Sequence, residues 1–158
     1  MSDPVRKVKV SLTEDQPIGE AVRGSLQTFL SGLPVPQKVE LATRGNREVR
    51  TLLSRDPSSL VARAVMASPR LANADVLAYA SSSLTNEEIL RIIGESPEWT
   101  RHPRVKLLLV SNPRTPAPVS LRFLGPLPYS ELVLLSRNRG VSPLIRSEAR
   151  KRAMRTRR

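Results

Sequence analysis

Residues 110–118 read Val-Ser-Asn-Pro-Arg-Thr-Pro-Ala-Pro, and this stretch decides how the fold is to be interpreted. It holds three prolines, a residue that breaks a helix when it enters the interior. Apolar patterning nevertheless continues on both sides, as VKLLLV over 105–110 and as VSLRFL over 119–124. Proline is tolerated at the first helical position, where its missing N–H would have had no partner. The stretch therefore predicts that one helix ends near Pro113 and that another begins at Pro116.

Similar signals for the ends and starts of helices recur from residue 36 onward. Three dipeptides place a capping side chain directly before proline, namely Asp56-Pro57, Thr115-Pro116 and Ser142-Pro143. Asn46 and Asn73 also stand before apolar periods, and Thr85 with Glu88 has the spacing of a capping box. These signals predict nine short helices, near 37–44, 47–54, 57–67, 74–82, 86–94, 103–111, 116–125, 129–136 and 143–155.

Helices of two to three turns are unstable alone, so each one needs an apolar stripe that packs against its neighbours. The spacing i, i+3, i+4 supplies such a stripe in four of them. The stripes are Val49, Leu52 and Leu53; Val61, Ala64 and Val65; Ile89, Ile92 and Ile93; and Val105, Leu108 and Leu109. Residues 61–81 also align with residues 105–125 without a gap. This self-similarity is typical of a helical solenoid, and it predicts an all-α fold.

A known repeat turn, Asn-Pro-x-Thr-Pro, is matched by Asn112, Pro113, Thr115 and Pro116. With this turn, residues 36–150 resemble the leucine-rich repeat variant group, whose repeats run as a short helix, the turn and a second short helix. The wider kinship is with HEAT and armadillo-like solenoids. The resemblance implies a short α-solenoid and a binding role, and it implies no reaction. Some members carry an iron–sulfur cluster on cysteines, a feature that does not carry over because this chain has no Cys.

Patterning and charge divide the chain into three parts. Residues 1–35 are interpreted as a flexible or accessory arm, in which 5–12 alternates weakly like a strand and 18–30 holds a weak helical period. Residues 36–145 form the predicted helical-repeat domain. Residues 146–158 form a basic helical tail that carries +6 of the chain's formal net charge of +12. Such a tail favours a polyanionic partner, and it equally fits a solvated end that aids solubility.

Few residues offer chemistry. His102 is the only histidine, and we expect it to precede the helix that begins at Pro103 rather than to act as a general base. The sequence contains no GxSxG nucleophile elbow and no glycine-rich phosphate loop, and no residues share metal-ligand spacing on one face. We therefore expect neither an enzyme nor a cofactor or metal site, and no small-molecule substrate is evident.

Two functions from different classes stay open. The preferred one is a non-enzymatic scaffold or adaptor that binds another macromolecule, in the first place a protein. The alternative is sequence-nonspecific nucleic-acid binding through a basic stripe and the tail. An aromatic content of 3% counts against base stacking on single strands. The candidate polyanion-binding residues are Arg44, Arg47, Arg50, Arg101, Arg104, Lys106, Arg150, Lys151, Arg152 and Arg155.

The sequence also bears on the compartment. No apolar run approaches the roughly 20 residues that cross a bilayer, and the first residues lack the basic-then-apolar order of a signal peptide. The absence of Cys fits a reducing compartment. These features predict a soluble, cytoplasmic protein without membrane insertion.

Overall fold

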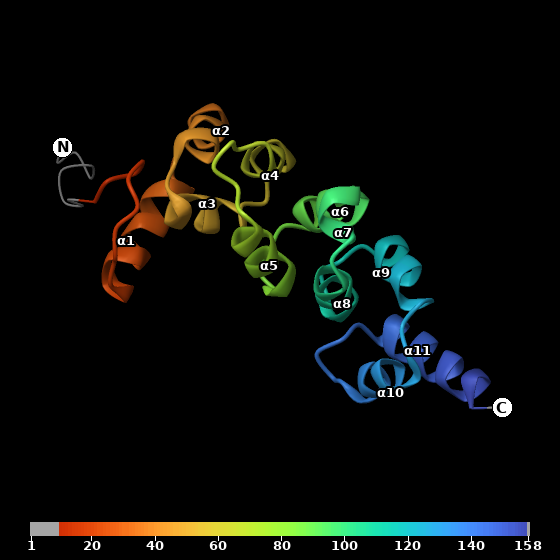
Figure 1. Ribbon diagram of the computed structural model, residues 1–158. Coiled ribbons are helices and arrows are strands. Elements are labelled where there is room, and N and C mark those ends of the chain that lie inside the picture. The colour runs from red at the N-terminus through yellow and green to blue at the C-terminus, as the bar shows by residue number, and fades with distance from the viewer. Residues whose placement is uncertain (1–9, 158) are drawn as a thin grey trace. The chain divides into compact units, whose positions relative to one another are not determined.

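The computed structural model describes residues 10–157, which form eleven helices and no strand (Figure 1). The predicted all-α fold class is confirmed for this part of the chain. The chain divides into two compact units, Met1–Asp75 and Val76–Arg158. The boundary falls within one helix, α5 (Asn73–Ser81), whose first turn belongs to the N-terminal unit.

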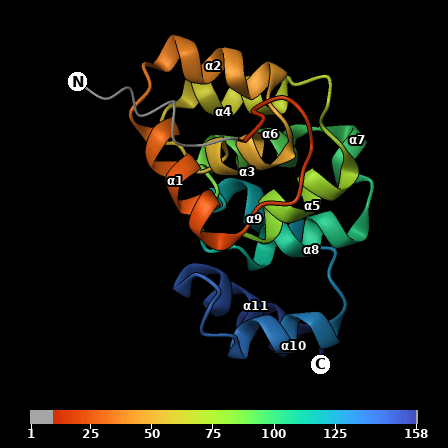
Figure 2. The ribbon, with the colours of Figure 1, turned by 90° about the vertical axis from the view of Figure 1, so that its left-hand side faces the viewer.

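The N-terminal unit contains four complete helices. They are α1 (Glu20–Ser31), α2 (Val35–Arg44), α3 (Arg47–Leu53) and α4 (Ser59–Met66). The short helix α3 packs against α1, α2 and α4, and α2 lies beside α4 (Figure 2). Leu26 and Leu30 of α1 are buried together with Val49 and Leu53 of α3. Helix α1 therefore belongs to the core of this unit.

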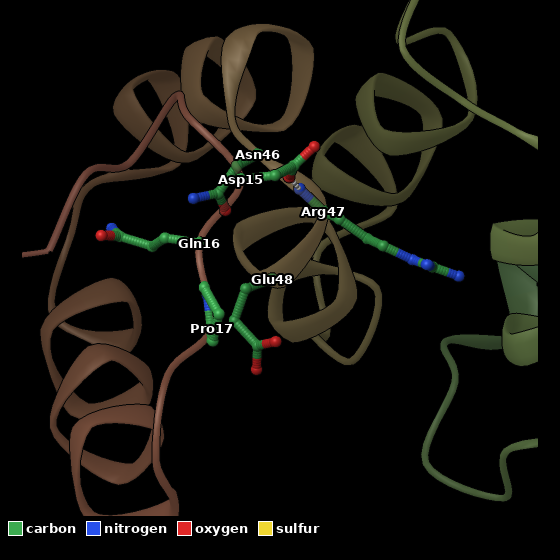
Figure 3. A pocket seen from close by; sticks show the side chains of 6 residues that line it. All are labelled: Asp15, Gln16, Pro17, Asn46, Arg47 and Glu48. Carbon is green, nitrogen blue, oxygen red and sulfur yellow. Dashed lines mark hydrogen bonds between the residues drawn. The ribbon is translucent and has the colours of Figure 1, made fainter.

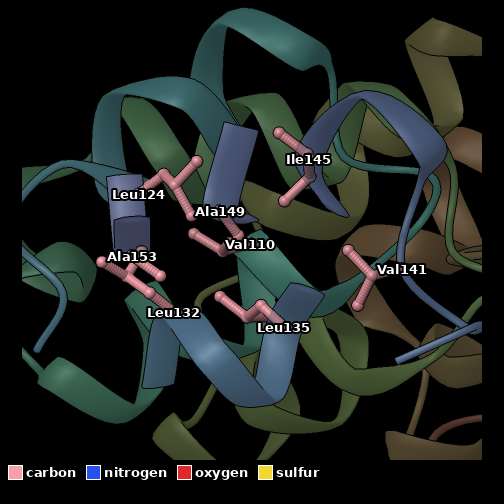
Figure 4. Close-up of a cluster of buried hydrophobic side chains, with 8 residues drawn as sticks. All are labelled: Val110, Leu124, Leu132, Leu135, Val141, Ile145, Ala149 and Ala153. Carbon is pink, nitrogen blue, oxygen red and sulfur yellow. The ribbon is translucent and has the colours of Figure 1, made fainter. Parts of the chain in front are cut away.

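The C-terminal unit contains the rest of α5 and six further helices. They are α6 (Glu87–Glu95), α7 (Pro97–Thr100), α8 (Pro103–Ser111), α9 (Ala117–Leu124), α10 (Tyr129–Arg137) and α11 (Pro143–Thr156). Helix α6 packs against α7, α8 and α9, while α11 packs against α9 and α10. A buried apolar cluster joins α8, α9, α10 and α11 (Figure 4). Its residues are Val110, Leu124, Leu132, Leu135, Val141, Ile145, Ala149 and Ala153.

All nine helices predicted between residues 37 and 155 are present, and their ends differ from the prediction by two residues or fewer. The weak period over 18–30 corresponds to the full helix α1. Helix α7 was not predicted, because its four residues, Pro97–Thr100, are too few to show a period. The predicted strand over 5–12 lies mostly outside the described residues, and its described part, 10–12, is not a strand.

One turn recurs between the helices and explains why Ser, Asn and Pro recur between the apolar segments. A side-chain oxygen of the first residue accepts a hydrogen bond from the backbone N–H two positions later. The carbonyl of the same residue accepts from the N–H three positions later. The first residues of these turns are Ser68, Ser82, Asn112 and Asn138. Ser and Asn favour such turns because their short side chains bond to the local backbone. Proline suits the second position, where it stands as Pro69 and Pro113.

Two predicted caps are confirmed. Asn46 accepts from the Val49 backbone N–H at 3.0 Å, and Ser142 accepts from that of Ile145 at 3.3 Å. Helix α5 begins at Asn73 itself, one residue earlier than predicted.

Three predicted caps are wrong. The Thr85 hydroxyl donates instead to the Tyr79 carbonyl, and Asn86 is the residue that caps α6. Thr115 is buried, and Pro116 occupies the capping position of α9. Asp56 accepts from the Ser58 N–H inside the preceding turn, and Ser58 precedes α4. The two threonines stand at the inward-facing fourth position of the recurring turn, which explains why they do not cap a helix.

The apolar stripes are shifted from the predicted spacing in three helices. Ala62, Leu90 and Val110 are buried, whereas Ala64, Ile92 and Leu108 are only half-buried. Each of these helices packs against at least two others, so its buried arc includes two adjacent positions instead of one narrow seam. In α3 the predicted residues Val49, Leu52 and Leu53 are all buried.

Candidate polyanion-binding surface

Helix α11 is fixed in rotation by its apolar line. Ile145, Ala149 and Ala153 follow one another at i, i+4 and i+8, and all three are buried in the cluster drawn in Figure 4. The small alanine side chains let α10 approach closely. Because the helix advances about 100° per residue, fixing this line determines where every other side chain of α11 points.

The arginines of α11 occupy the two sides of its solvent-facing surface. One side, here called the first edge, carries Arg146, Arg150 and Arg157 at i, i+4 and i+11. The other side, the second edge, carries Arg152 and Arg155, and Lys151 lies between the two edges, near the middle of the exposed face. Arg150, Lys151, Arg155 and Arg157 are exposed, while Arg146 and Arg152 are half-buried. Cationic side chains therefore flank the exposed face of the helix along its length.

Most of these cations lack an acidic partner. Lys151 pairs with Glu148 at 3.2 Å, and Glu148 is the only acidic residue of α11. The five arginines of the two edges form no ion pair with any residue in 10–157. The buried Nε atoms of Arg146 and Arg152 also have no hydrogen-bond partner within the described chain. The positive charge of α11 is thus left almost uncompensated.

Arg50 has a different role from the one predicted. It is 3% exposed, and its guanidinium donates to the Gly45 carbonyl at 2.9 Å and to the Asp75 carboxylate at 3.0 Å. A buried, paired guanidinium holds the unit together and does not face a polyanion. This corrects its place among the exposed candidates. Sequence spacing failed here because Asp75 lies 25 positions away.

The neighbouring candidates in the N-terminal unit are also paired. Arg47 is exposed, and its Nε lies 2.9 Å from the Asp75 Oδ1 atom. Arg44 is exposed and lies 3.4 Å from Glu40. Elsewhere in this unit Arg23 bonds to Glu48, and this hydrogen bond raises the pKa of Arg23. The cations of the N-terminal unit are mostly matched by its own carboxylates.

The candidate cations around α7 and α8 differ in their exposure and in their contacts. Arg101 and Arg104 are exposed and have no ion pair with a described residue. Lys106 is half-buried, and its Nζ lies 6.0 Å from the centroid of the Phe123 ring. The Arg122 guanidinium lies closer to the same ring, at 4.7 Å. Lys106 is therefore partly engaged, whereas Arg101 and Arg104 are available to a ligand.

Charge differs strongly between the two units. Residues 76–157 contain fourteen Lys and Arg against six Glu, a formal net charge of +8. Residues 10–75 contain eight Lys and Arg against seven acidic residues, a net charge of +1. Three exposed arginines of the C-terminal unit were missed by sequence reasoning, which looked for clusters: Arg114, Arg137 and Arg139. Arg114 and Arg139 lie inside the recurring turn, and that position is the signal that points to them.

A pocket of about 400 Å³ lies in the N-terminal unit (Figure 3). Its lining residues are Asp15, Gln16, Pro17, Asn46, Arg47 and Glu48. The polar side chains that line it already have partners within the described chain. Asp15 accepts from the Arg47 backbone N–H, and the Asn46 amide donates to the carbonyls of Ser11 and Glu14, each at 2.9 Å. These bonds tie residues 11–15 to the start of α3, so we interpret the pocket as part of the fold.

Other chemistry is sparse in the part of the chain that the structure describes. His102 precedes α8, is exposed and makes no side-chain capping bond. Within residues 10–157 no group of three or more His, Asp or Glu side chains could hold a metal ion. None of the described helices has the length and apolar character needed to span a bilayer.

Comparisons with protein-family models, with curated proteins and with solved structures found no match to this chain. Its own surface is therefore the basis for inferring its function.

Proposed function

We propose that this chain is a non-enzymatic helical module that binds nucleic acid through the sugar–phosphate backbone, without reading base sequence. The observation that carries the proposal is the row of unpaired cations on the rigidly packed α11. Arginine suits this role because its planar guanidinium can donate two hydrogen bonds to one phosphate. Backbone contacts of this kind give affinity that is independent of sequence.

The distribution of charge favours a ligand over a merely solvated helix. The N-terminal unit shows that this chain pairs its cations with its own carboxylates. Along α11 and its C-cap residue Arg157, six cations stand within twelve positions, among which there is a single carboxylate. Such a cluster repels itself in the free protein. Binding a polyanion would relieve this repulsion and release counterions.

The test is the salt dependence of binding. Fluorescence anisotropy with a labelled DNA would compare the parent with the variant Arg150→Gln, Lys151→Gln, Arg155→Gln between 50 and 200 mM KCl. Removing one cation that binds a phosphate should reduce the slope of log K against log salt by about 0.9, so the triple variant should reduce it by up to about 3. These side chains are exposed, so the fold should not change.

A matched control removes the same charge from the N-terminal unit. The variant Arg44→Gln, Arg55→Gln, Arg63→Gln also changes three exposed cations and should keep the parental slope. The proposal is contradicted if the parent does not bind DNA or RNA at 50 mM KCl. It is also contradicted if both variants reduce the slope equally.

A second candidate is a scaffold that binds a protein, and exposed apolar side chains favour it. Leu134 of α10 is 63% exposed, and Leu144 and Met154 of α11 are 49% and 63% exposed. A protein partner would bury such groups and gain about 25 cal/mol per Å² covered. Purification from the source cell should then recover a stoichiometric partner that the variant Leu134→Ser loses.

For the architecture we propose a short α-solenoid of HEAT or armadillo type, close to the leucine-rich repeat variant group. Recurrence of the same hydrogen-bonded turn at Ser68, Ser82, Asn112 and Asn138 supports it. Solenoids repeat one supersecondary unit, and a shared turn is what such repetition predicts. A crystal structure in which residues 61–81 do not superimpose on 105–125 would reject this architecture.

A further inference from the structure

We infer that α11 enters the major groove of double-stranded DNA, with each of its cationic edges against one phosphate wall. The inference rests on the proposed nucleic-acid binding and names its ligand as a B-form duplex. The surface concerned is the solvent-facing side of α11, defined by the first edge, the second edge and the strip between them.

The dimensions of α11 fit this groove. Its 14 residues give a length of about 21 Å at 1.5 Å per residue and a diameter of about 10–12 Å with side chains. The major groove of B-DNA is about 12 Å wide and about 8.5 Å deep, and it admits one α-helix. The A-form groove of an RNA duplex is too narrow and deep for side chains to read. The dimensions of α11 therefore match the major groove of a DNA duplex and not that of an RNA duplex.

The placement of charge matches a groove with two walls. Arg150 and Arg157 are exposed on the first edge, and Arg155 is exposed on the second edge. Cations on both sides of the helix can reach phosphates on both strands at once.

The strip between the edges suits the floor of the groove. Ser147, Lys151 and Met154 lie there, all three are exposed, and none carries a negative charge. Serine bonds to any base, and an apolar side chain contacts the methyl group of thymine. Such a strip discriminates weakly among sequences. It also contains no aromatic ring on which an unpaired base could stack.

The rest of the C-terminal unit holds α11 so that its cationic face is exposed to solvent. Its apolar line is buried against α9 and α10, so the two edges and the strip are the faces left to solvent. The cap from Ser142 fixes the start of the helix. A preorganised helix loses little conformational freedom on binding. The ordered fold thus supplies the rigidity that groove insertion needs.

The experiment uses the full chain and fluorescence anisotropy at one salt concentration. The probes are a 20-base-pair DNA duplex, the RNA duplex of the same sequence, the single-stranded DNA, and the DNA duplex with bulky groups at pyrimidine C5, which fill the major groove. We expect the plain DNA duplex to bind at least about tenfold more tightly than the other three, because only it lets both edges reach phosphates.

Variants test the two edges and the strip separately. Arg150→Gln and Arg155→Gln should each weaken binding to the DNA duplex severalfold, whereas the control Arg55→Gln, at an exposed residue of the N-terminal unit, should change it little. Ser147→Glu should weaken the DNA duplex much more than the single strand, since an acid on the groove floor faces base edges and nearby phosphates. Circular dichroism would show that each variant remains folded.

The outcomes distinguish the inference from the function on which it rests. Equal affinity for DNA and RNA duplexes, or full tolerance of the C5 groups, overturns the major-groove inference. In that case a salt slope that falls in the Arg150, Lys151 and Arg155 variant still upholds general nucleic-acid binding. Failure to bind any of the four probes at low salt overturns both.

Discussion

The side-chain amide of Asn112 donates a hydrogen bond of 2.8 Å to the backbone carbonyl of Ala80, which lies 32 positions earlier in the chain. The same nitrogen donates to the Ser82 carbonyl at 2.9 Å, and the Asn112 side-chain oxygen accepts from the Arg114 N–H at 3.0 Å. Asn112 is 6% exposed. One side chain therefore closes its own turn and satisfies carbonyls at the end of α5, which joins two helix ends of the C-terminal unit.

Replacing Asn112 by Ala should lower the free energy of unfolding by about 1–3 kcal/mol, since buried carbonyls lose their donor. The measurement is urea unfolding followed by the fluorescence of Trp99, the single tryptophan, which lies in this unit. Asn138→Ala is the control, because Asn138 is exposed and, within residues 10–157, its side chain bonds only to the Gly140 N–H. Equal losses in the two variants would show that the long-range bonds of Asn112 contribute nothing.

Two threonines at the same position of the turn should respond differently to valine. The Thr85 hydroxyl donates to the Tyr79 carbonyl at 2.7 Å, whereas the buried Thr115 hydroxyl has no hydrogen-bond partner among residues 10–157. Thr85→Val should cost about 1–3 kcal/mol. Thr115→Val should be neutral or stabilising, because it removes an unsatisfied buried polar group of similar shape. Trp99 fluorescence in urea compares them, and a larger loss at Thr115 would contradict this assignment.

Gly94 should not tolerate a side chain. A Cβ atom added there would overlap the Cγ1 atom of Val119, which belongs to the facing helix α9. Gly94→Ala should therefore destabilise the C-terminal unit by about 1–3 kcal/mol through overpacking. The double variant with Val119→Ala should be less destabilised than the sum of the single variants, and strict additivity would argue against the clash.

Gly24→Ala is the matched control for this experiment. A Cβ atom at Gly24 would meet nothing within 4 Å, so alanine should stabilise α1 by about 0.5–1 kcal/mol through its higher helix propensity. Far-UV circular dichroism in urea reports on this helix. A loss of stability here would show that α1 is more crowded than its surroundings indicate.

Asp75 should be the most sensitive carboxylate of the N-terminal unit. It is 2% exposed and holds both Arg47 and Arg50, and its side chain also accepts from the Ala72 N–H. Asp75→Ala would leave the Arg50 guanidinium buried without its counterion, which should cost about 3–5 kcal/mol. Glu40→Ala breaks the exposed pair with Arg44 and should cost less than about 1 kcal/mol.

Hydrogen exchange at the amides of α3 would measure this difference. In Asp75→Ala these amides should lose most of their protection, and in Glu40→Ala they should keep it. If protection is the same in both variants, the buried pair between Arg50 and Asp75 does not stabilise α3.

Most of the helical layout was predictable, because the signals for helix ends are local. Proline, capping residues and apolar periods act within a few positions, and they located nine of the eleven described helices. The directions of Thr85 and Thr115 were not predictable in the same way. A threonine beside a helix start can cap that helix or turn inward, and its choice depends on whether packed neighbours cover it.

The sequence by itself determined where nine of the eleven described helices lie and that positive charge is concentrated in residues 146–158, since both depend on local composition and spacing. Only the tertiary structure decided which cations are available to a partner. Arg50 and the exposed Arg150 look alike in sequence, yet Arg50 is buried against a carboxylate 25 positions away while Arg150 has no acidic partner among the described residues. Burial and ion pairing depend on contacts between segments that are far apart in the sequence, and local residue spacing does not reveal those contacts.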